Sequence, residues 1–181
     1  MNTLAQPVMT GTPELLSRAQ SGEREAFTEL VERHHDELVR ITFAITGDID
    51  DARDAAQLAW IKAWQQLRSV REPERLRTWL IAIAANEARQ RVRADKRRRV
   101  REITPVLPDG ADNAAVGAAD RLDLSAALSR LDADDRRLLA LRYLAGMTAD
   151  EIGGAIGLSG SGVRTRLSRL VAQLREELSN D

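Results

Sequence analysis

The stretch from Thr148 to Arg175 (TADEIGGAIGLSGSGVRTRLSRLVAQLR) constrains the fold of this chain more than any other. Thr148 followed three residues later by Glu151 is the pattern of a capping box, which predicts that a helix begins there. Gly157 can take the backbone conformation of a sharp turn, and Ser159 can cap a second helix. That second helix has an apolar stripe at the spacing of one buried face, formed by Val163, Leu167, Leu170, Val171 and Leu174.

The other side of the second helix is polar and cationic. It carries Ser161, Thr165, Ser168 and Arg169, flanked by Arg164 and Arg166. Two helices joined by a Gly-containing turn, with small and cationic residues outward on the second, are typical of a DNA-binding helix-turn-helix. Short helical hairpins are also common elsewhere, and an arginine-rich face is usually only solvated surface. The rest of the chain has to decide between these two interpretations.

Helical patterns fill the remainder, and no segment alternates as a strand does. The chain is 43% hydrophobic but only 3% aromatic, so its core is built from small aliphatic residues that suit helix packing. We predict an all-α fold of two small helical domains joined by a flexible linker rich in proline and glycine. The expected parts are a loose tail (1–11), a first domain (12–101), the linker (102–120) and a second domain (121–181). Helices are expected at 12–20, 23–45, 50–67, from Pro73 into the arginine run, at 122–131, and from Asp132 to Gly146.

Charge is distributed unevenly along the chain. The formal net charge is −1, which by itself argues against a nucleic-acid partner. Residues 89–101, however, hold eight arginines and lysines against the single acid Asp95. That many like charges repel one another unless an anion neutralises them, and phosphate is the natural partner. We therefore expect nucleic-acid binding that weakens steeply with salt.

The order of these parts resembles the bacterial RNA polymerase sigma factors of the sigma-70 family, in their small extracytoplasmic-function (ECF) subgroup. The resemblance covers nearly the whole chain and rests on three stretches: DARDAAQLAWIKAW (Asp51–Trp64), RTWLIAIAANEARQRVR (Arg77–Arg93) and MTADEIGGAIGLSGSGVRTRLSRL (Met147–Leu170). It implies that the first domain is sigma region two and the second is region four. It also implies a non-enzymatic protein that brings core RNA polymerase to promoters and helps to melt the DNA.

In region two, the resemblance assigns the helix over Asp51–Trp64 to the clamp helices of the largest polymerase subunit. The implied contacts are Asp51, Asp54, Gln57 and Trp60. Acids and an amide near one helix end can pair with arginines of a partner, but acids there also simply favour the helix N-terminus. Trp60 and Trp64 fit the core better than a contact surface.

The resemblance assigns recognition and melting of the minus-ten promoter element to the loop and helix that follow. A flipped base of a single strand requires a pocket, and the strand's backbone requires cationic walls. The candidates are Arg68, Arg71, Arg75, Arg77, Asn86, Arg89 and Arg93. Trp79 falls on the apolar stripe of the helix and is expected in the core.

In region four, the resemblance places the second hairpin helix in the major groove of the minus-thirty-five element. The candidates for base and phosphate contacts are Ser159, Ser161, Arg164, Thr165, Arg166, Ser168 and Arg169. Two departures from the family's usual pattern stand out. Gly162 removes a possible hydroxyl contact, and Gly153-Gly154 loosens the supporting helix at a cost of about 1 kcal/mol per glycine.

Other function classes fit less well. His34 and His35 are adjacent and cannot form a metal pair on one helix face, and no phosphate-binding loop or nucleophile motif is present. No metal, cofactor or small-molecule substrate is expected. A regulator that binds DNA without polymerase, or an interaction protein that merely retains the architecture, stays possible; binding to core polymerase would separate both from a sigma factor.

The chain's location and partners follow from the same considerations. The N-terminus lacks the pattern of a signal peptide, no apolar run approaches the length of a membrane span, and there is no cysteine. We expect a soluble cytoplasmic protein without membrane insertion. The resemblance implies core RNA polymerase (clamp helices and flap) and promoter DNA as partners, and commonly an anti-sigma factor.

Overall fold

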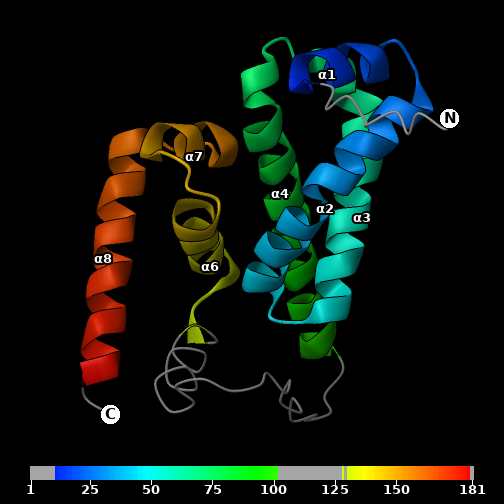
Figure 1. Ribbon diagram of the computed structural model, residues 1–181. Helices are drawn as coiled ribbons and strands as arrows, with labels where there is room; N and C mark the ends of the chain where they lie inside the picture. The colour runs from blue at the N-terminus through cyan, green and yellow to red at the C-terminus, as the bar shows by residue number, and fades with distance from the viewer. Residues whose placement is uncertain (1–10, 102–127, 129, 180–181) are drawn as a thin grey trace, which may run out of the picture.

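The computed structural model describes residues 11–101, 128 and 130–179, and all regular elements within these residues are helical (Figure 1). The all-α prediction is therefore confirmed. The elements, in chain order, are α1 (Thr12–Gln20), α2 (Arg24–Thr46), α3 (Ile49–Gln66), the 3₁₀ turns Leu67–Ser69 and Pro73–Arg75, α4 (Leu76–Arg101), α6 (Ala133–Leu139) with its π-helical continuation (Ala140–Leu144), α7 (Ala149–Ile156) and α8 (Gly160–Ser179).

Short sequence signals set the ends of the first three helices. Gly47 adopts a left-handed conformation (φ 75°) and ends α2. Asp48 then caps α3, since its carboxylate accepts hydrogen bonds from the backbone N–H groups of Asp50 and Asp51, both at 2.9 Å. The observed bounds of α1, α2 and α3 agree with the expected ones to within one residue.

The helices α2, α3 and α4 form one bundle, with α1 across its end (Figure 1). The buried face of α3 consists almost entirely of small residues, which let the flanking helices approach closely. These residues are Ala52, Ala55, Ala56, Ala59 and Ala63. Larger side chains from α2 and α4 fill the space against them, including Leu38, Ile41, Leu80 and Ile81, each at most 2% exposed.

The pair α7 and α8 is the predicted hairpin. The capping box is present: Thr148 accepts from the backbone N–H of Glu151 at 3.3 Å, and the Glu151 carboxylate accepts from that of Thr148 at 2.7 Å. Gly157 ends α7 with φ 77°, and Ser159 caps α8 by accepting from the backbone N–H of Gly162 at 3.1 Å. Each of these local predictions is confirmed.

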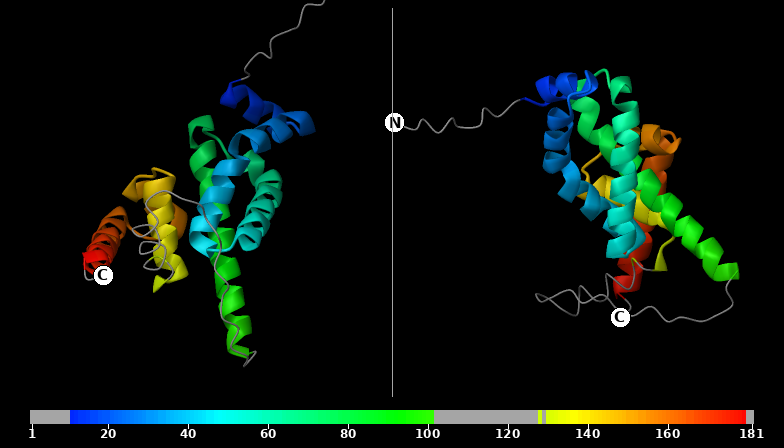
Figure 2. Two further views of the ribbon diagram at one scale, coloured as in Figure 1. Left: turned by 60° about the horizontal axis from the view of Figure 1, so that its bottom comes forward. Right: turned by 90° about the vertical axis from the view of Figure 1, so that its right-hand side faces the viewer.

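The helix α6 lies beside α2 and α4, and α8 lies on the far side of α6 from that bundle (Figures 1 and 2). Arginines join the two groups of helices: Arg136 of α6 donates to the carbonyl of Ile45 at 2.8 Å, and Arg77 of α4 donates to the carbonyl of Ala145 at 3.0 Å. The predicted linker, and all but the end of the helix expected at 122–131, lie outside the described residues.

Candidate nucleic-acid and protein interfaces

The first candidate surface is the outward face of α3. Arg91 of α4 reaches both predicted contact acids, with Nε 2.8 Å from Asp51 and Nη2 2.7 Å from Asp54. Burial raises the pKa of the Asp51 carboxyl, and the hydrogen bond from Arg91 acts in the opposite direction. Asp54 stays half in solvent, with 51% of its side chain exposed, so it can still meet a partner.

Trp60 lies inside the bundle rather than on this face. It is 8% exposed, and its indole N–H donates to Nδ1 of His35 at 3.3 Å. Phe27 packs edge-on against both Trp60 and Trp64, with ring centroids 5.8 Å and 4.8 Å apart. Trp64, which was expected in the core, is 40% exposed. The two tryptophans therefore differ in their surroundings.

Two apolar side chains of α3 that were not predicted as contacts face outward. Leu58 is 43% exposed and Ile61 is 49% exposed, and their i, i+3 spacing places them on one side of the helix next to Trp64. A hollow of about 580 Å³ lies between α2 and α3 and is lined in part by His35 and Gln57. The signal that could have identified them is the run of alanines, because these already complete a buried face.

Six of the seven residues predicted for the minus-ten element fall into two groups, and Arg77 stands apart. Arg68, Arg71 and Arg75 lie exposed in the loop before α4, where Arg75 pairs with Glu72 at 2.7 Å. On α4, Asn86, Arg89 and Arg93 have the i, i+3, i+7 spacing of a single face. Arg77 is separate from that face, since it pairs with Glu37 of α2.

Arg89 is not free for a ligand in this conformation. Its guanidinium forms a two-pronged contact with Asp134 in the first turn of α6, the longer hydrogen bond measuring 3.2 Å. This hydrogen bond lowers the pKa of the Asp134 carboxyl and raises that of Arg89. The structure thus joins a predicted DNA contact to the C-terminal half of the chain.

The outward face of α8 carries four of the seven predicted minus-thirty-five contacts. Ser161, Arg164, Thr165 and Ser168 are exposed at the i, i+3, i+4, i+7 spacing of one helix face, with Arg169 exposed beside them. Arg166, in contrast, turns toward α6, where it binds Asp135 at 2.7 Å. Ser159 serves as the helix cap, and its hydroxyl also lies 3.1 Å from that of Ser161.

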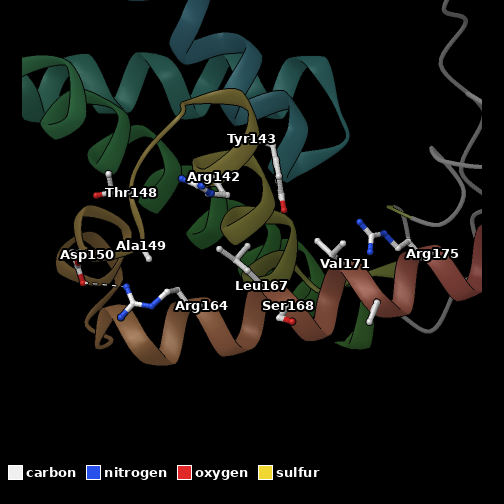
Figure 3. A pocket seen from close by; sticks show the side chains of 11 residues that line it. Arg142, Tyr143, Thr148, Ala149, Asp150, Arg164, Leu167, Ser168, Val171 and Arg175 are labelled. Carbon is white, nitrogen blue, oxygen red and sulfur yellow. Dashed lines mark ion pairs between the residues drawn. The ribbon is translucent and has the colours of Figure 1, made fainter.

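A groove of about 590 Å³ runs between α8 and the chain that precedes it (Figure 3). Leu167 and Val171 of α8 form one wall, and Tyr143 lies across from them (Figure 3). Tyr143 and its neighbour Leu144 are 62% and 57% exposed because the π-helical turn Ala140–Leu144 adds a residue to the helical repeat. Leu144 is apolar and lies within the helix expected from Asp132 to Gly146, yet its side chain faces solvent.

Comparison with known proteins identifies both halves of the chain. Residues 30–98 match the family described as Sigma-70 region 2, and residues 127–176 match Sigma-70, region 4. The ECF RNA polymerase sigma factor SigE of Mycolicibacterium smegmatis is 30% identical over 94% of this chain and 68% of its own length. The chain belongs to the ECF sigma factors of the sigma-70 family.

Two further relatives show how far the similarity extends. The probable RNA polymerase sigma factor RfaY of Xanthomonas campestris pv. campestris is 32% identical, and the match covers 90% of this chain but only 43% of that protein. The solved structure of CnrH, in complex with the cytosolic domain of CnrY, matches with a TM-score of 0.66 at 27% identity. That match covers 92% of this chain and 96% of CnrH.

These matches confirm the predicted family and its two regions. The fold and family predictions rested on pattern and resemblance, and both are correct. The individual polymerase and promoter contacts stay predictions, and the structure adds where each one lies. Among the described helices, none is both long and apolar enough to cross a membrane. No group of three or more potential metal ligands occurs among the described residues.

Proposed function

We propose that this protein is an alternative sigma factor that binds core RNA polymerase, directs it to specific promoters and promotes melting of the DNA. Sigma factors are non-catalytic subunits, so the chemistry belongs to the polymerase. The observation that carries the proposal is the presence on one chain of a partly apolar, acidic face on α3 and a polar, cationic face on α8. We assign region two to residues 12–101, the linker to 102–120 and region four to 121–181.

The polymerase contact in region two is assigned to the outward face of α3. Exposed apolar side chains next to carboxylates favour a partner helix that offers both apolar and cationic residues. Leu58 and Ile61 supply apolar area, while Asp54 and Gln57 supply polar partners for arginines of the clamp helices. The buried Trp60 supports this face from behind.

The minus-ten contact is assigned to the loop before α4 and to one face of α4. The exposed arginines Arg68, Arg71 and Arg75 can track a single-stranded backbone once Arg75 leaves Glu72 and Arg68 leaves the carbonyl of Gln20. Asn86, Arg89 and Arg93 continue the surface along α4, where Asn86 is half-buried and offers an amide to a base edge. Arg77 stands apart from this face and is assigned to phosphate.

Region four is assigned to two partners on adjoining surfaces of α8, which meet at Arg164 and Ser168. The face with Ser161, Arg164, Thr165 and Ser168 enters the major groove of the minus-thirty-five element, with Arg169 on phosphate. Ser159 orders the start of that helix, and Arg166 joins the DNA contacts once it leaves Asp135. The groove beside Tyr143 combines apolar side chains such as Leu167 and Val171 with charged ones such as Arg142, which suits an amphipathic helix, and we assign it to the polymerase flap.

The location and one further partner belong to the same proposal. Core polymerase works in the cytoplasm, so we place this protein there. CnrH has been solved with the cytosolic domain of CnrY, a second protein. We propose that an anti-sigma factor covers some of the surfaces described above in this protein too.

The experiment is run-off transcription from a library of genomic fragments with purified bacterial core polymerase. Discrete transcripts that require this protein are expected, and their aligned start sites would reveal both promoter elements. Ile61→Lys should abolish these transcripts by placing an unpaired ammonium in the polymerase interface, whereas the matched variant Ile61→Leu should preserve them. If wild-type protein neither binds core polymerase nor yields transcripts, the proposal is wrong and the protein is a free-standing DNA-binding regulator.

A further inference from the structure

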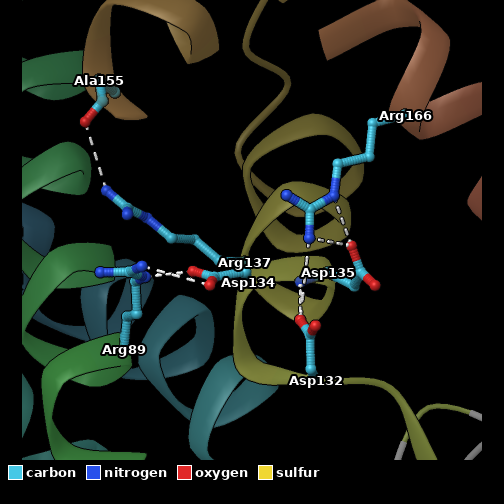
Figure 4. A network of polar contacts seen from close by, with 7 residues as sticks. All are labelled: Arg89, Asp132, Asp134, Asp135, Arg137, Ala155 and Arg166. Carbon is cyan, nitrogen blue, oxygen red and sulfur yellow. Dashed lines mark hydrogen bonds and ion pairs between the residues drawn. The ribbon is translucent and has the colours of Figure 1, made fainter. Parts of the chain in front are cut away.

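The start of α6 holds three carboxylates that face arginines assigned to promoter DNA (Figure 4). Asp134 binds Arg89 of α4, in region two. Asp135 lies 2.7 Å from Arg166 of α8, in region four, and Asp132 lies 4.0 Å from the same guanidinium. One helical turn therefore engages DNA-facing cations from both halves of the protein.

The contact to Arg89 imitates a contact to phosphate. A guanidinium binds a carboxylate and a phosphate by the same two-pronged geometry, so the two anions compete for one set of N–H donors. Only 26% of the Arg89 side chain stays exposed while Asp134 is in place. A DNA strand can reach this guanidinium only after the first turn of α6 has moved away.

Asp134 also balances a second, deeply buried cation. Arg137 is 6% exposed, and one of its guanidinium nitrogens donates to the carbonyl of Ala155 at 3.3 Å (Figure 4). Burial lowers the pKa of Arg137, the charge of Arg89 lowers it further, and Asp134 opposes both effects. The charge of Asp134 thus offsets the repulsion between two guanidinium groups at the boundary between the regions.

Two more arginines fasten the same boundary. Arg77, which is also assigned to the minus-ten element, donates to the carbonyl of Ala145 at 3.0 Å, and Arg136 donates to that of Ile45 at 2.8 Å. The donors of Arg77 and Arg89 are therefore used within the chain in the same conformation. Separation of α6 from α4 breaks the contact of Arg89 with Asp134, whereas Arg77 keeps its pair with Glu37 of α2.

We infer that the first turn of α6 is an internal competitor for promoter DNA, which holds regions two and four together and keeps Arg89 and Arg166 from DNA until the regions separate. The inference rests on the proposed assignment of these arginines to the promoter. It predicts that the free protein binds DNA weakly, and that whatever separates the regions also exposes the DNA-binding surface.

The test uses the full chain with Asp134→Asn, which removes the carboxylate but leaves the helix cap Asp132 in place. Glu176→Gln is the matched control, because it removes the same charge from an exposed site in region four. The chain contains no cysteine, so dyes can be attached at Ser17→Cys in α1 and Gly154→Cys in α7 without background labelling. Energy transfer between the dyes reports the separation of the regions, and single-stranded DNA of mixed sequence serves as the binding probe.

Asp134→Asn should lower the energy transfer and tighten DNA binding by about two- to fivefold, the range for a partly exposed ion pair. The log–log salt dependence of binding should steepen by about 0.7, the value for one additional phosphate contact on a single strand. Glu176→Gln should match the wild type in both measurements. If Asp134→Asn behaves like this control in either measurement, the inference is wrong.

A second pair of variants covers the case in which Asp134→Asn loses its fold. Asp134→Arg alone should separate the regions, and adding Arg89→Asp should restore the wild-type energy transfer by reversing the ion pair. Absence of that rescue would also overturn the inference. Run-off transcription with core polymerase tests the proposed function separately from this inference. Absence of transcripts with both wild type and Asp134→Asn would count against the function. The dye measurement would still show whether the contact between Asp134 and Arg89 holds the regions together.

Discussion

Two adjacent glycines in α7 allow a sharp test of the close packing within the helix-turn-helix. A Cβ added at Gly153 would lie 2.5 Å from the carbonyl oxygen of Leu158 and 3.3 Å from the backbone nitrogen of Gly160. A Cβ added at Gly154 would meet nothing within 4 Å. An alanine side chain is therefore crowded by the turn at Gly153 and meets open space at Gly154.

The expected magnitudes follow from these distances. Either alanine gains about 1 kcal/mol of helix propensity over glycine. At Gly153 the carbonyl of Leu158 must retreat by about 1 Å to reach an ordinary contact, and crowding of this kind costs about 1–3 kcal/mol. The retreat strains the turn, because the N–H groups of Gly157 and Leu158 both donate to the Gly153 carbonyl, at 2.9 and 3.0 Å. Losing one such bond costs about 1 kcal/mol more.

We therefore expect Gly153→Ala to destabilise region four by about 1–3 kcal/mol and Gly154→Ala to stabilise it by about 0.5–1 kcal/mol. Urea unfolding followed by circular dichroism measures both, with Gly154→Ala as the control for propensity. Gly153→Ala should also weaken binding to a minus-thirty-five duplex, since the turn sets the angle of α8. Equal stability of the two variants would refute the reasoning. It would mean that Gly153 has no packing role and only lowers the helix propensity of α7.

Three further predictions address the two surfaces and the helix cap. Ile61→Ala should weaken binding to core polymerase by about 1 kcal/mol, because full burial of an isoleucine side chain contributes about 1.5–3 kcal/mol and about half of this one is still exposed. A titration with labelled core polymerase measures the change. Unchanged affinity would mean that the interface lies elsewhere. Because Arg164 is assigned to a base edge, Arg164→Ala should cost about 1–3 kcal/mol of promoter affinity. Fluorescence anisotropy with a minus-thirty-five duplex identified from the transcripts measures this. No loss of affinity would mean that another side of α8 faces DNA. The hydrogen bond from the backbone of Thr148 lowers the pKa of Glu151 below its ordinary 4.5, so the capping box stabilises region four above that pH and loses this contribution as the pH falls through the lowered value. Glu151→Gln should remove this part of the acid dependence of the unfolding midpoint, and an identical pH profile in both proteins would contradict it.

Local signals predicted the helix ends well because each one depends on only a few neighbouring residues. Thr148, Gly157 and Ser159 act through hydrogen bonds and backbone angles within one turn, so the sequence alone predicts their effect. The resemblance to the sigma-70 family, carried by three motifs in order, then predicted the assembly of the helices into two regions. Both levels of prediction are confirmed.

Predictions failed where side-chain size and distant contacts decide the outcome. Trp64 was expected in the core, and Leu58 and Ile61 were not predicted as contacts. The small alanines of α3 form the buried face instead and leave these larger residues partly exposed. The partners of Arg89 and Arg166 could not be predicted, since 27 cationic and 28 acidic residues allow many pairings. Only the packing of α6 between α4 and α8 selects Asp134 and Asp135 among them.

The π-helical turn after α6 has a consequence for how this region can change in length. Within it the N–H of Ala145 donates to the carbonyl of Ala140, five residues back, at 3.0 Å. Such a turn is equivalent to one residue inserted into an α-helix, which displaces neighbouring side chains outward while the flanking core keeps its register. Deleting one residue here would restore an ordinary helix and withdraw Tyr143 from the groove. Gain or loss of a single codon at this position would therefore alter the groove that we assign to the polymerase flap, while Leu138 and Met147 stay in the core on either side.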